Sequence, residues 1–248
     1  RQEDDTIGQA IYIVNALTGE RVWSGGVGVG VTQKFPEMKY SIPATLAVAD
    51  SDEDGFDDII VVGDTGGQVW RFDIRKNESV NEFISGGVIA DLGVADGPNT
   101  QRDDRRFYHG ADIARLASAA QGEFAITLGS GNRSSPLGAV TQNRFFMLRQ
   151  SFGKSRTYKT LYQDDLLSAG VSGDWSEVAY SDHEGWYLDL LHPGEKVLSV
   201  PLSWHNTVTF STYQPGIQKP DCAVDPAKSR LYQVGLPDAA PVNRWSTV

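Results

Sequence analysis

The sequence has little sulfur and few histidines: its 248 residues include one cysteine, two methionines and four histidines. A single cysteine excludes a disulfide within the chain, so Cys222 is either a free thiol or bonded to a partner. The histidines are scattered, and no two have the two-residue or four-residue spacing typical of zinc and copper ligands. The sequence therefore gives no support to a soft-metal site.

Positive charge and long apolar runs are also scarce. Lysine and arginine number 22 against 32 aspartates and glutamates, which gives a net charge of −10, and no basic cluster is interleaved with aromatic residues. This balance makes nucleic acid and anionic membrane surfaces unsuitable partners. No apolar run approaches the ~18 residues that cross a bilayer, so membrane insertion is not expected.

Glycine and aromatic residues, by contrast, are plentiful: the chain has 26 Gly, 9 Tyr, 10 Phe and 6 Trp. Short apolar runs rich in β-branched and aromatic residues alternate with glycine-containing turns, and no useful stretch keeps a 3.6-residue apolar period. The chain is therefore predicted to be mostly β, with one short helix near 164–169. The predicted strands are 11–14, 21–23, 44–49, 59–63, 68–74, 111–116, 123–129, 143–148, 196–200, 207–212 and 230–234.

These strands recur in a common order of strand, strand, glycine turn and aromatic strand, with the aromatic strands around Trp70, Phe146 and Tyr232. Small sheets that each end in an aromatic outer strand must stack on like neighbours to bury their faces, as propeller blades do. Three units are fewer than the roughly four to eight blades of a closed ring. We therefore predict a modified β-propeller, partial or a fragment of one, with residues 1–248 in a single domain and insertions near 75–110 and 150–184. The alternative is an irregular β-sandwich.

One acidic segment, residues 50–58, carries the clearest chemical signal. Its sequence, Asp-Ser-Asp-Glu-Asp-Gly-Phe-Asp-Asp, alternates carboxylates as a calcium-binding loop does, with glycine at the sixth position for the sharp bend. Neighbouring carboxylates repel one another, and a hard divalent cation removes that repulsion. The predicted Ca²⁺ ligands are the carboxylates of Asp50, Asp52, Asp54 and Asp58 and the main-chain carbonyl of Phe56.

The loop differs from an EF-hand in two respects. Val61 stands at position twelve, where an EF-hand has a bidentate glutamate, and the flanking segments 47–49 and 59–62 read as buried strands rather than helices. The site is therefore predicted in a β-to-β turn. Oxygen-only ligands favour calcium over zinc or copper, and magnesium resists a cage made wholly of protein. The alternative is an acidic surface turn without a metal.

Catalytic signatures are weak. The sequence contains no Gly-x-Ser-x-Gly nucleophile elbow, and the adjacent acids Asp103–Asp104 and Asp164–Asp165 would point apart in a strand or loop. We therefore expect a protein that is not an enzyme. Two alternatives stay open: a quinone-dependent propeller dehydrogenase, whose repeats share the Thr-Gly-Glu-x-x-Trp-like pattern near Thr18–Trp23, and a carbohydrate-binding or adhesive module.

Several separated segments resemble the carboxy-terminal domain of the PilY-type proteins associated with bacterial type IV pili. The resemblance covers most of the chain, from about Gln9 to Leu236, and its combination of segments is more specific than any one of them. The segments are Pro-Ala at 43–44, Val-Gly-Asp-Thr-Gly-Gly-Gln-Val-Trp-Arg-Phe-Asp at 62–73, Gly-Ser-Gly-Asn-Arg at 129–133, Gly-Trp-Tyr-Leu-Asp-Leu at 185–190, Pro-Leu at 201–202, Phe-Ser-Thr-Tyr-Gln-Pro at 210–215 and Arg-Leu-Tyr at 230–232.

The resemblance implies a modified β-propeller with one calcium in a blade loop, held by the five residues named above. It also implies an amino-terminal region that is missing here, and we expect the chain to be a fragment. Family members act in pilus extension and surface attachment. The implied partners are pilins or minor pilins and a host or abiotic surface. The implied location is extracellular, on the bacterial cell surface, at the pilus tip or associated with the outer membrane.

Overall fold

A computed structural model of the chain describes residues 4–76, 78–79, 82–93, 101–116, 122–153, 158–169, 183–216 and 225–242. Within these ranges the structure has sixteen strands and one short 3-10 turn, and none of their residues is α-helical. The prediction of a mostly-β chain is confirmed. The described residues also contain no helix long and apolar enough to cross a membrane. Cys222 lies outside the described residues.

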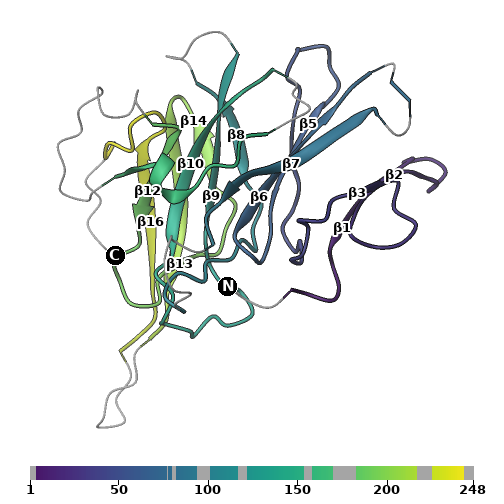
Figure 1. Ribbon diagram of the computed structural model, residues 1–248. Coiled ribbons are helices and arrows are strands. Elements are labelled where there is room, and N and C mark those ends of the chain that lie inside the picture. Colours follow the sequence, from purple (N-terminus) through teal and green to yellow (C-terminus); the bar gives the residue numbers. More distant parts are fainter. Residues whose placement is uncertain are drawn as a thin grey trace.

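The strands form four sheets, A to D, which largely follow one another along the chain (Figure 1). Most neighbouring strands are antiparallel. Sheet A is β1 (Ala10–Val14), β2 (Arg21–Gly26) and β3 (Gln33–Lys34). Sheet B is β4 (Ala47–Ala49), β5 (Ile59–Gly63), β6 (Gln68–Ile74) and β7 (Ile84–Asp91), in that spatial order.

The second half of the chain forms the other two sheets. Sheet C, in spatial order, is β11 (Leu167–Ser168), β12 (Gly185–Asp189), β10 (Arg144–Ser151), β9 (Glu123–Gly129) and β8 (Asp112–Arg115). Sheet D is β13 (Lys196–Val197), β14 (Leu202–Trp204), β15 (Thr207–Gln214) and β16 (Lys228–Gly235). In sheet D, β16 pairs along the whole of β15, while β13 and β14 pair with its two ends. Two neighbouring pairs of the four sheets, β2 with β3 and β11 with β12, are parallel.

The core lies between the sheets, and alternate residues of one strand serve different parts of it. On β5, Ile59 and Val61 belong to the cluster shared by sheets B and C, whereas Ile60 and Val62 belong to the cluster shared by sheets A and B. Strand β10 shows the same alternation. The side chains on one of its faces belong to the cluster shared by sheets B and C, and those on the other face belong to a cluster shared by sheets C and D. Because side chains alternate across a strand, each central sheet is packed on both faces.

Aromatic rings fill these inter-sheet layers. Between sheets A and B, the Phe35 and Phe72 rings meet edge to face with centroids 5.4 Å apart, and Trp23 and Trp70 complete the group. The buried Trp23 and Trp70 therefore help to join sheet A to sheet B. In the described residues each sheet stacks on the next and the series does not close into a barrel, which is the organisation of a partial propeller.

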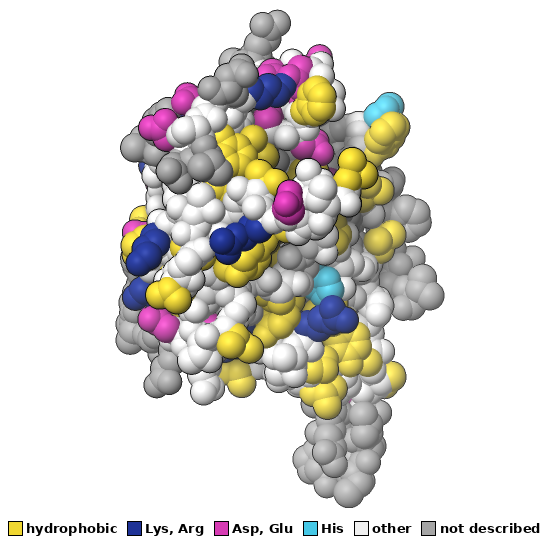
Figure 2. Space-filling view, turned by 90° about the vertical axis from the view of Figure 1, so that its right-hand side faces the viewer, with side chains coloured by type: hydrophobic (Ala, Val, Ile, Leu, Met, Phe, Trp, Pro, Cys, Tyr) yellow, Lys and Arg dark blue, Asp and Glu magenta, His cyan; other side chains and the backbone are white. Residues whose placement is uncertain are grey.

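The two outer sheets each leave an apolar face in solvent. Tyr12 and Val14 of β1 are exposed, as are Leu202 and Trp204 of β14. Figure 2 looks at the molecule from the side of sheet A and shows apolar side chains exposed there among charged ones. The four stacked sheets thus have two unpaired outer faces, one at each end of the series.

Glycine has a specific role in the turn between β5 and β6, which carries the Asp-Thr-Gly-Gly motif. Asp64 Oδ1 accepts hydrogen bonds from the main-chain N–H groups of Gly66 and Gln68, both at 2.9 Å, and Oδ2 accepts from Trp70 Nε1 at 3.0 Å. Gly67 has a φ of +83°, and a Cβ there would stand 2.1 Å from the Cα of Gly93. The turn therefore requires both the carboxylate and the glycine.

Three details differ from expectation. The aromatic strands β6 and β10 are interior strands, paired on both edges, and only β16 is an outer strand. Strand β7 lies within 75–110, so part of that predicted insertion belongs to sheet B. The short helix predicted near 164–169 is a 3-10 turn at Gln163–Asp165 followed by a strand. The division into one domain with two insertions stays a prediction, since both ranges lie partly outside the described residues.

Candidate metal centre

The acidic segment 50–58 connects β4 to β5, in the β-to-β turn that the sequence predicted. Ala49 and Ile59 are the last paired residues of the two antiparallel strands. The Asp58 N–H donates to the Ala49 carbonyl at 2.9 Å, which closes the base of the loop. Because β5 is buried along its whole length, one end of the loop is anchored in the core.

Three of the predicted ligands lie together at the tip of this loop. One carboxylate oxygen from each of Asp50, Asp52 and Asp54 lies within 4.8 Å of the others. Calcium binds oxygens at about 2.3–2.6 Å, so two oxygens on opposite sides of one ion are at most about 5 Å apart. The spacing and the all-oxygen donor set therefore fit a calcium ion.

Local hydrogen bonds shape the loop around this group. The Asp50 carboxylate accepts from the Gly55 N–H at 2.7 Å and from the Asp54 N–H at 3.3 Å, so the chain folds back over its own first residue. Glu53 and Gly55 both have positive φ values, of 60° and 89°. Backbone of this kind is easiest for glycine, which explains the glycine at the sixth position.

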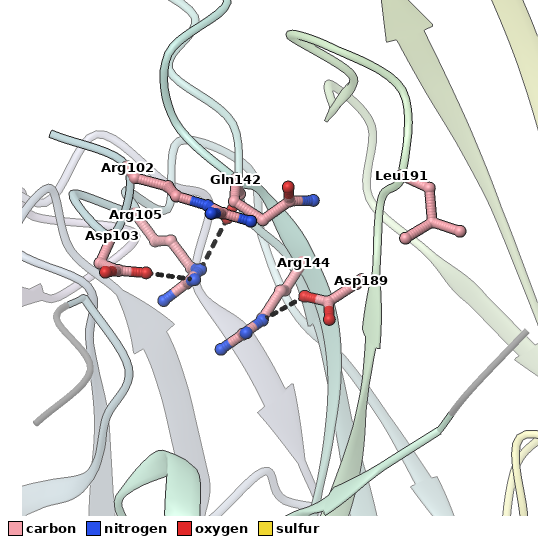
Figure 3. A pocket seen from close by; sticks show the side chains of 7 residues that line it. All are labelled: Arg102, Asp103, Arg105, Gln142, Arg144, Asp189 and Leu191. Carbon is pink, nitrogen blue, oxygen red and sulfur yellow. Dashed lines mark hydrogen bonds and ion pairs between the residues drawn. The ribbon is translucent and has the colours of Figure 1, made fainter.

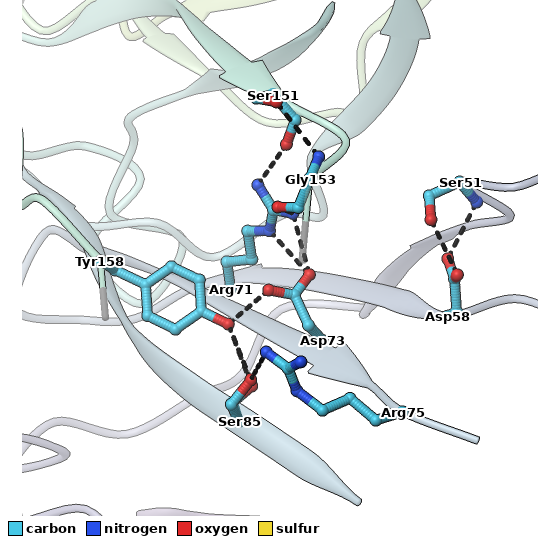
Figure 4. Close-up of polar contacts among 9 residues, drawn as sticks. All are labelled: Ser51, Asp58, Arg71, Asp73, Arg75, Ser85, Ser151, Gly153 and Tyr158. Carbon is cyan, nitrogen blue, oxygen red and sulfur yellow. Dashed lines mark hydrogen bonds and ion pairs between the residues drawn. The ribbon is translucent and has the colours of Figure 1, made fainter. Parts of the chain in front are cut away.

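Phe56 and Asp58 have different surroundings. The Phe56 side chain is exposed, and its N–H donates to Asp54 Oδ1 at 3.1 Å. The Asp58 side chain is buried and lies outside the group of three. Its Oδ1 accepts from the Ser51 N–H at 2.8 Å and its Oδ2 from the Ser51 hydroxyl at 2.7 Å (Figure 4). Asp58 therefore holds the start of the loop through its two hydrogen bonds with Ser51. The ligand roles of Phe56 and Asp58 stay predictions.

Two basic residues from other parts of the chain contact the loop. Sequence reasoning predicted neither contact. Lys76, which follows β6, forms an ion pair with Asp54 and lies 5.2 Å from the centre of the Phe56 ring. Arg115, the last residue of β8, pairs with Glu53 at 3.0 Å. A cation bound between the carboxylates would compete with Lys76 for Asp54, since both are attracted to the same oxygens.

The loop is also connected to the interior of sheet B. The Asp58 carbonyl accepts from the N–H of Ile74, the last residue of β6, at 2.7 Å. The same strand carries Arg71 and Asp73, which form a buried ion pair at 2.9 Å (Figure 4). Asp58 is thus hydrogen-bonded directly to a strand in the middle of the sheet.

The ion pair on β6 holds sheets B and C together. Arg71 also donates to the carbonyl of Ser151, the last residue of β10, at 2.7 Å, and the Tyr158 hydroxyl donates to Asp73 (Figure 4). Burial, together with the Asp73 carboxylate, raises the pKa of the Tyr158 hydroxyl above its usual value. Tyr158 therefore stays protonated and continues to donate.

Comparisons with known proteins bear on what this chain resembles. No family model matches it. A curated relative from Xylella fastidiosa, described as a type IV pilus biogenesis factor PilY1 homolog, is 25% identical over 86% of this chain. The chain spans only 16% of that relative's length.

The solved structures give an independent comparison. The crystal structure of the Pseudomonas aeruginosa PilY1 C-terminal domain matches 96% of this chain with a TM-score of 0.64 and 14% identity. The chain spans about half of that structure, 54% of its length. Sequence and fold thus point to the same kind of protein. The predicted resemblance is confirmed: the chain is similar in sequence to a PilY1 homolog and has the fold of a PilY-type carboxy-terminal domain.

Proposed function

We propose that the chain is the calcium-binding, non-enzymatic part of a type IV pilus biogenesis and surface-attachment factor. The observation that carries the proposal is the group formed by Asp50, Asp52 and Asp54 on a hairpin of a PilY1-like fold. Support for the pilus assignment comes from the relative, which is described as a pilus biogenesis factor, and from the fold. Neither of these relatives is described as an enzyme.

In this proposal Asp50, Asp52 and Asp54 hold the ion, and the carbonyl of Phe56 and the Asp58 carboxylate complete the site. Bound calcium supplies positive charge that removes the repulsion between the carboxylates. Asp50 orders the tip through the N–H groups of Gly55 and Asp54, and Asp58 ties the loop to β6. The loop thereby becomes rigid on a sheet that is already packed on both faces.

The proposed role of the rigid loop is to present this end of the blade to a partner. Pilins or minor pilins, and a host or abiotic surface, are the proposed partners. The proposed location is outside the cell, on the bacterial surface, at the pilus tip or associated with the outer membrane. The whole protein's partners are proposals, because the chain spans a small part of its relative.

Calorimetric titration of the metal-free protein with calcium tests the site. We expect one ion to bind, and Asp54→Ala to weaken binding at least about tenfold, since it removes one charged ligand. The matched control is Asp57→Asn, which removes a negative charge from the same loop but not from the group of three. If Asp54→Ala binds calcium as tightly as the parent, the ion is not held here.

A further inference from the structure

A hollow of about 320 Å³ lies away from the acidic loop, where the segment 101–106 meets the first residues of β10 and the end of β12. Figure 3 shows three arginines with their guanidinium groups at this hollow: Arg102 and Arg105 come from the segment 101–106, and Arg144 is the first residue of β10. Like charges are brought this close only when the fold or a counter-ion compensates for the repulsion.

Arg105 is the most unusual of the three, because its side chain is only 1% exposed. Its Nε donates to the Gln142 carbonyl at 2.8 Å, and one terminal nitrogen donates to Asp103 Oδ1 at 2.9 Å. The other terminal nitrogen, NH1, is buried and has no acceptor in the described part of the chain. A buried N–H that has lost water without gaining an acceptor is rare in folded proteins.

The charges around the hollow do not cancel. Arg144 pairs with Asp189 at 2.6 Å, and Arg105 pairs with Asp103 at 2.9 Å. Arg102 is exposed at the mouth, and no ion pair of its guanidinium occurs among the described residues. Among the described residues that line the hollow, three cations against two carboxylates give a net charge of +1, and neither ion pair involves Arg102.

The electrostatics of Arg105 agree with this geometry. Burial, with a further contribution from the nearby charge of Arg144, lowers the pKa of Arg105 to about 10, against the opposing effect of Asp103. Burial therefore makes the positive charge of Arg105 unfavourable, and an anion bound in the hollow beside it would reduce that unfavourable energy.

We propose that this hollow binds a singly charged carboxylate, with the exposed Arg102 guanidinium as its donor and the charge of the buried Arg105 beside it. The planar fork of arginine matches the two oxygens of a carboxylate. A single negative charge balances the net +1 of the lining, whereas a dianion such as phosphate would be repelled by Asp103 and Asp189. The proposal does not depend on calcium binding, because it uses none of the residues of the acidic loop.

The carboxylate could belong to an acidic sugar or to a peptide, so the test uses one probe of each kind. Sodium glucuronate and N-acetylglycine are titrated into the ¹⁵N-labelled protein at constant calcium and ionic strength, and the arginine Nε–H signals are followed by NMR. Glucose and N-acetylglycinamide are the neutral controls, and inorganic phosphate, a mixture of monoanion and dianion at neutral pH, is the more highly charged comparison. We expect at least one carboxylate to shift the Arg105 signal saturably at millimolar concentration, with phosphate weaker and the neutral probes without effect.

Variants then identify the donor. Arg102→Gln should weaken carboxylate binding at least about fivefold without changing thermal stability, because Arg102 is exposed and forms no ion pair among the described residues. Arg21→Gln, on an exposed position of sheet A, is the control and should bind as the parent does. Tighter glucuronate binding would assign a sugar acid, and tighter N-acetylglycine binding a peptide; either supports the proposal. Saturable binding that Arg102→Gln leaves unchanged, stronger binding of phosphate, or no saturable binding would overturn it.

Discussion

At the scale of single residues, Lys76 is the contact that most directly opposes calcium. It pairs with Asp54, and both side chains are partly exposed, so the pair contributes about 0.2–1 kcal/mol to the metal-free loop. Lys76→Gln removes this competitor and one positive charge close to the site. We expect calcium to bind about two- to fivefold more tightly, as measured by calorimetric titration. Arg21→Gln, which removes a positive charge from an exposed position of sheet A, should leave the affinity unchanged.

Asp58 differs from the other loop acids because it already has partners when no metal is bound. Asp58→Ala removes the acceptors of the Ser51 N–H and hydroxyl. We expect the metal-free protein to lose about 2–3 kcal/mol of unfolding free energy, measured by urea denaturation with a chelator present. Asp52→Asn, at an exposed carboxylate of the metal group, should change the metal-free value little. Equal effects of the two substitutions would contradict the role of Asp58 in holding the loop.

At the scale of elements, the β5–β6 turn contains a buried acid whose titration should be measurable. Burial raises the pKa of Asp64 to about 7, although the hydrogen bonds from Trp70, Gln68 and Gly66 act in the opposite direction. Because the folded pKa is above the unfolded value of about 3.9, the folded state holds the proton more tightly. The stability that Asp64 contributes is therefore complete below about pH 4 and is lost as the pH rises through 7.

Asp64→Asn removes this titration. The stability difference between parent and variant should move in the variant's favour from pH 5 to pH 7, by up to about 1.4 kcal/mol per pH unit, and level off above pH 8. Urea denaturation of both proteins across this range, with a chelator present, measures the difference. Asp4→Asn, at an exposed surface acid, is the control. A difference that does not vary with pH would show that Asp64 is ionised throughout.

The elements also show which features local sequence could predict. Strand β5 and the hairpin loop were predictable because Ile59, Ile60 and the alternating aspartates are local patterns. Strand β7 was missed because it contains two glycines, and the structure explains them. A Cβ at Gly86 would stand 2.2 Å from the Phe72 ring, and one at Gly87 would stand 2.8 Å from the Tyr158 ring. Close packing by other segments requires glycine there, which weakens the strand signal.

Contacts between segments that are far apart in the sequence could not be predicted either, because they also depend on tertiary packing. Lys76, which follows β6, and Arg115, at the end of β8, contact the acidic loop, and no spacing in the sequence indicates these contacts. The interior position of β6 likewise depends on its pairing with β7. Tertiary pairing thus decides the surroundings of the candidate site, while its three convergent carboxylates follow from the local pattern of the loop.

At the scale of the whole molecule, four sheets are stacked in series and joined by apolar layers and by the Arg71–Asp73 pair. The acidic loop is connected through Asp58 to β6, in the middle of this series. A cation that orders the loop should therefore stabilise the whole stack. If the dissociation constant is near 10 µM, 1 mM calcium would stabilise the folded state by about 2.7 kcal/mol.

Thermal unfolding of the parent and of Asp52→Asn, each with a chelator, with 1 mM calcium and with 1 mM magnesium, measures this stabilisation. We expect calcium to raise the Tm of the parent by about 5–10 °C, magnesium to raise it less, and Asp52→Asn to lose most of the calcium effect. A parent whose Tm is the same with chelator and with calcium, or a variant that responds as fully as the parent, would contradict this expectation.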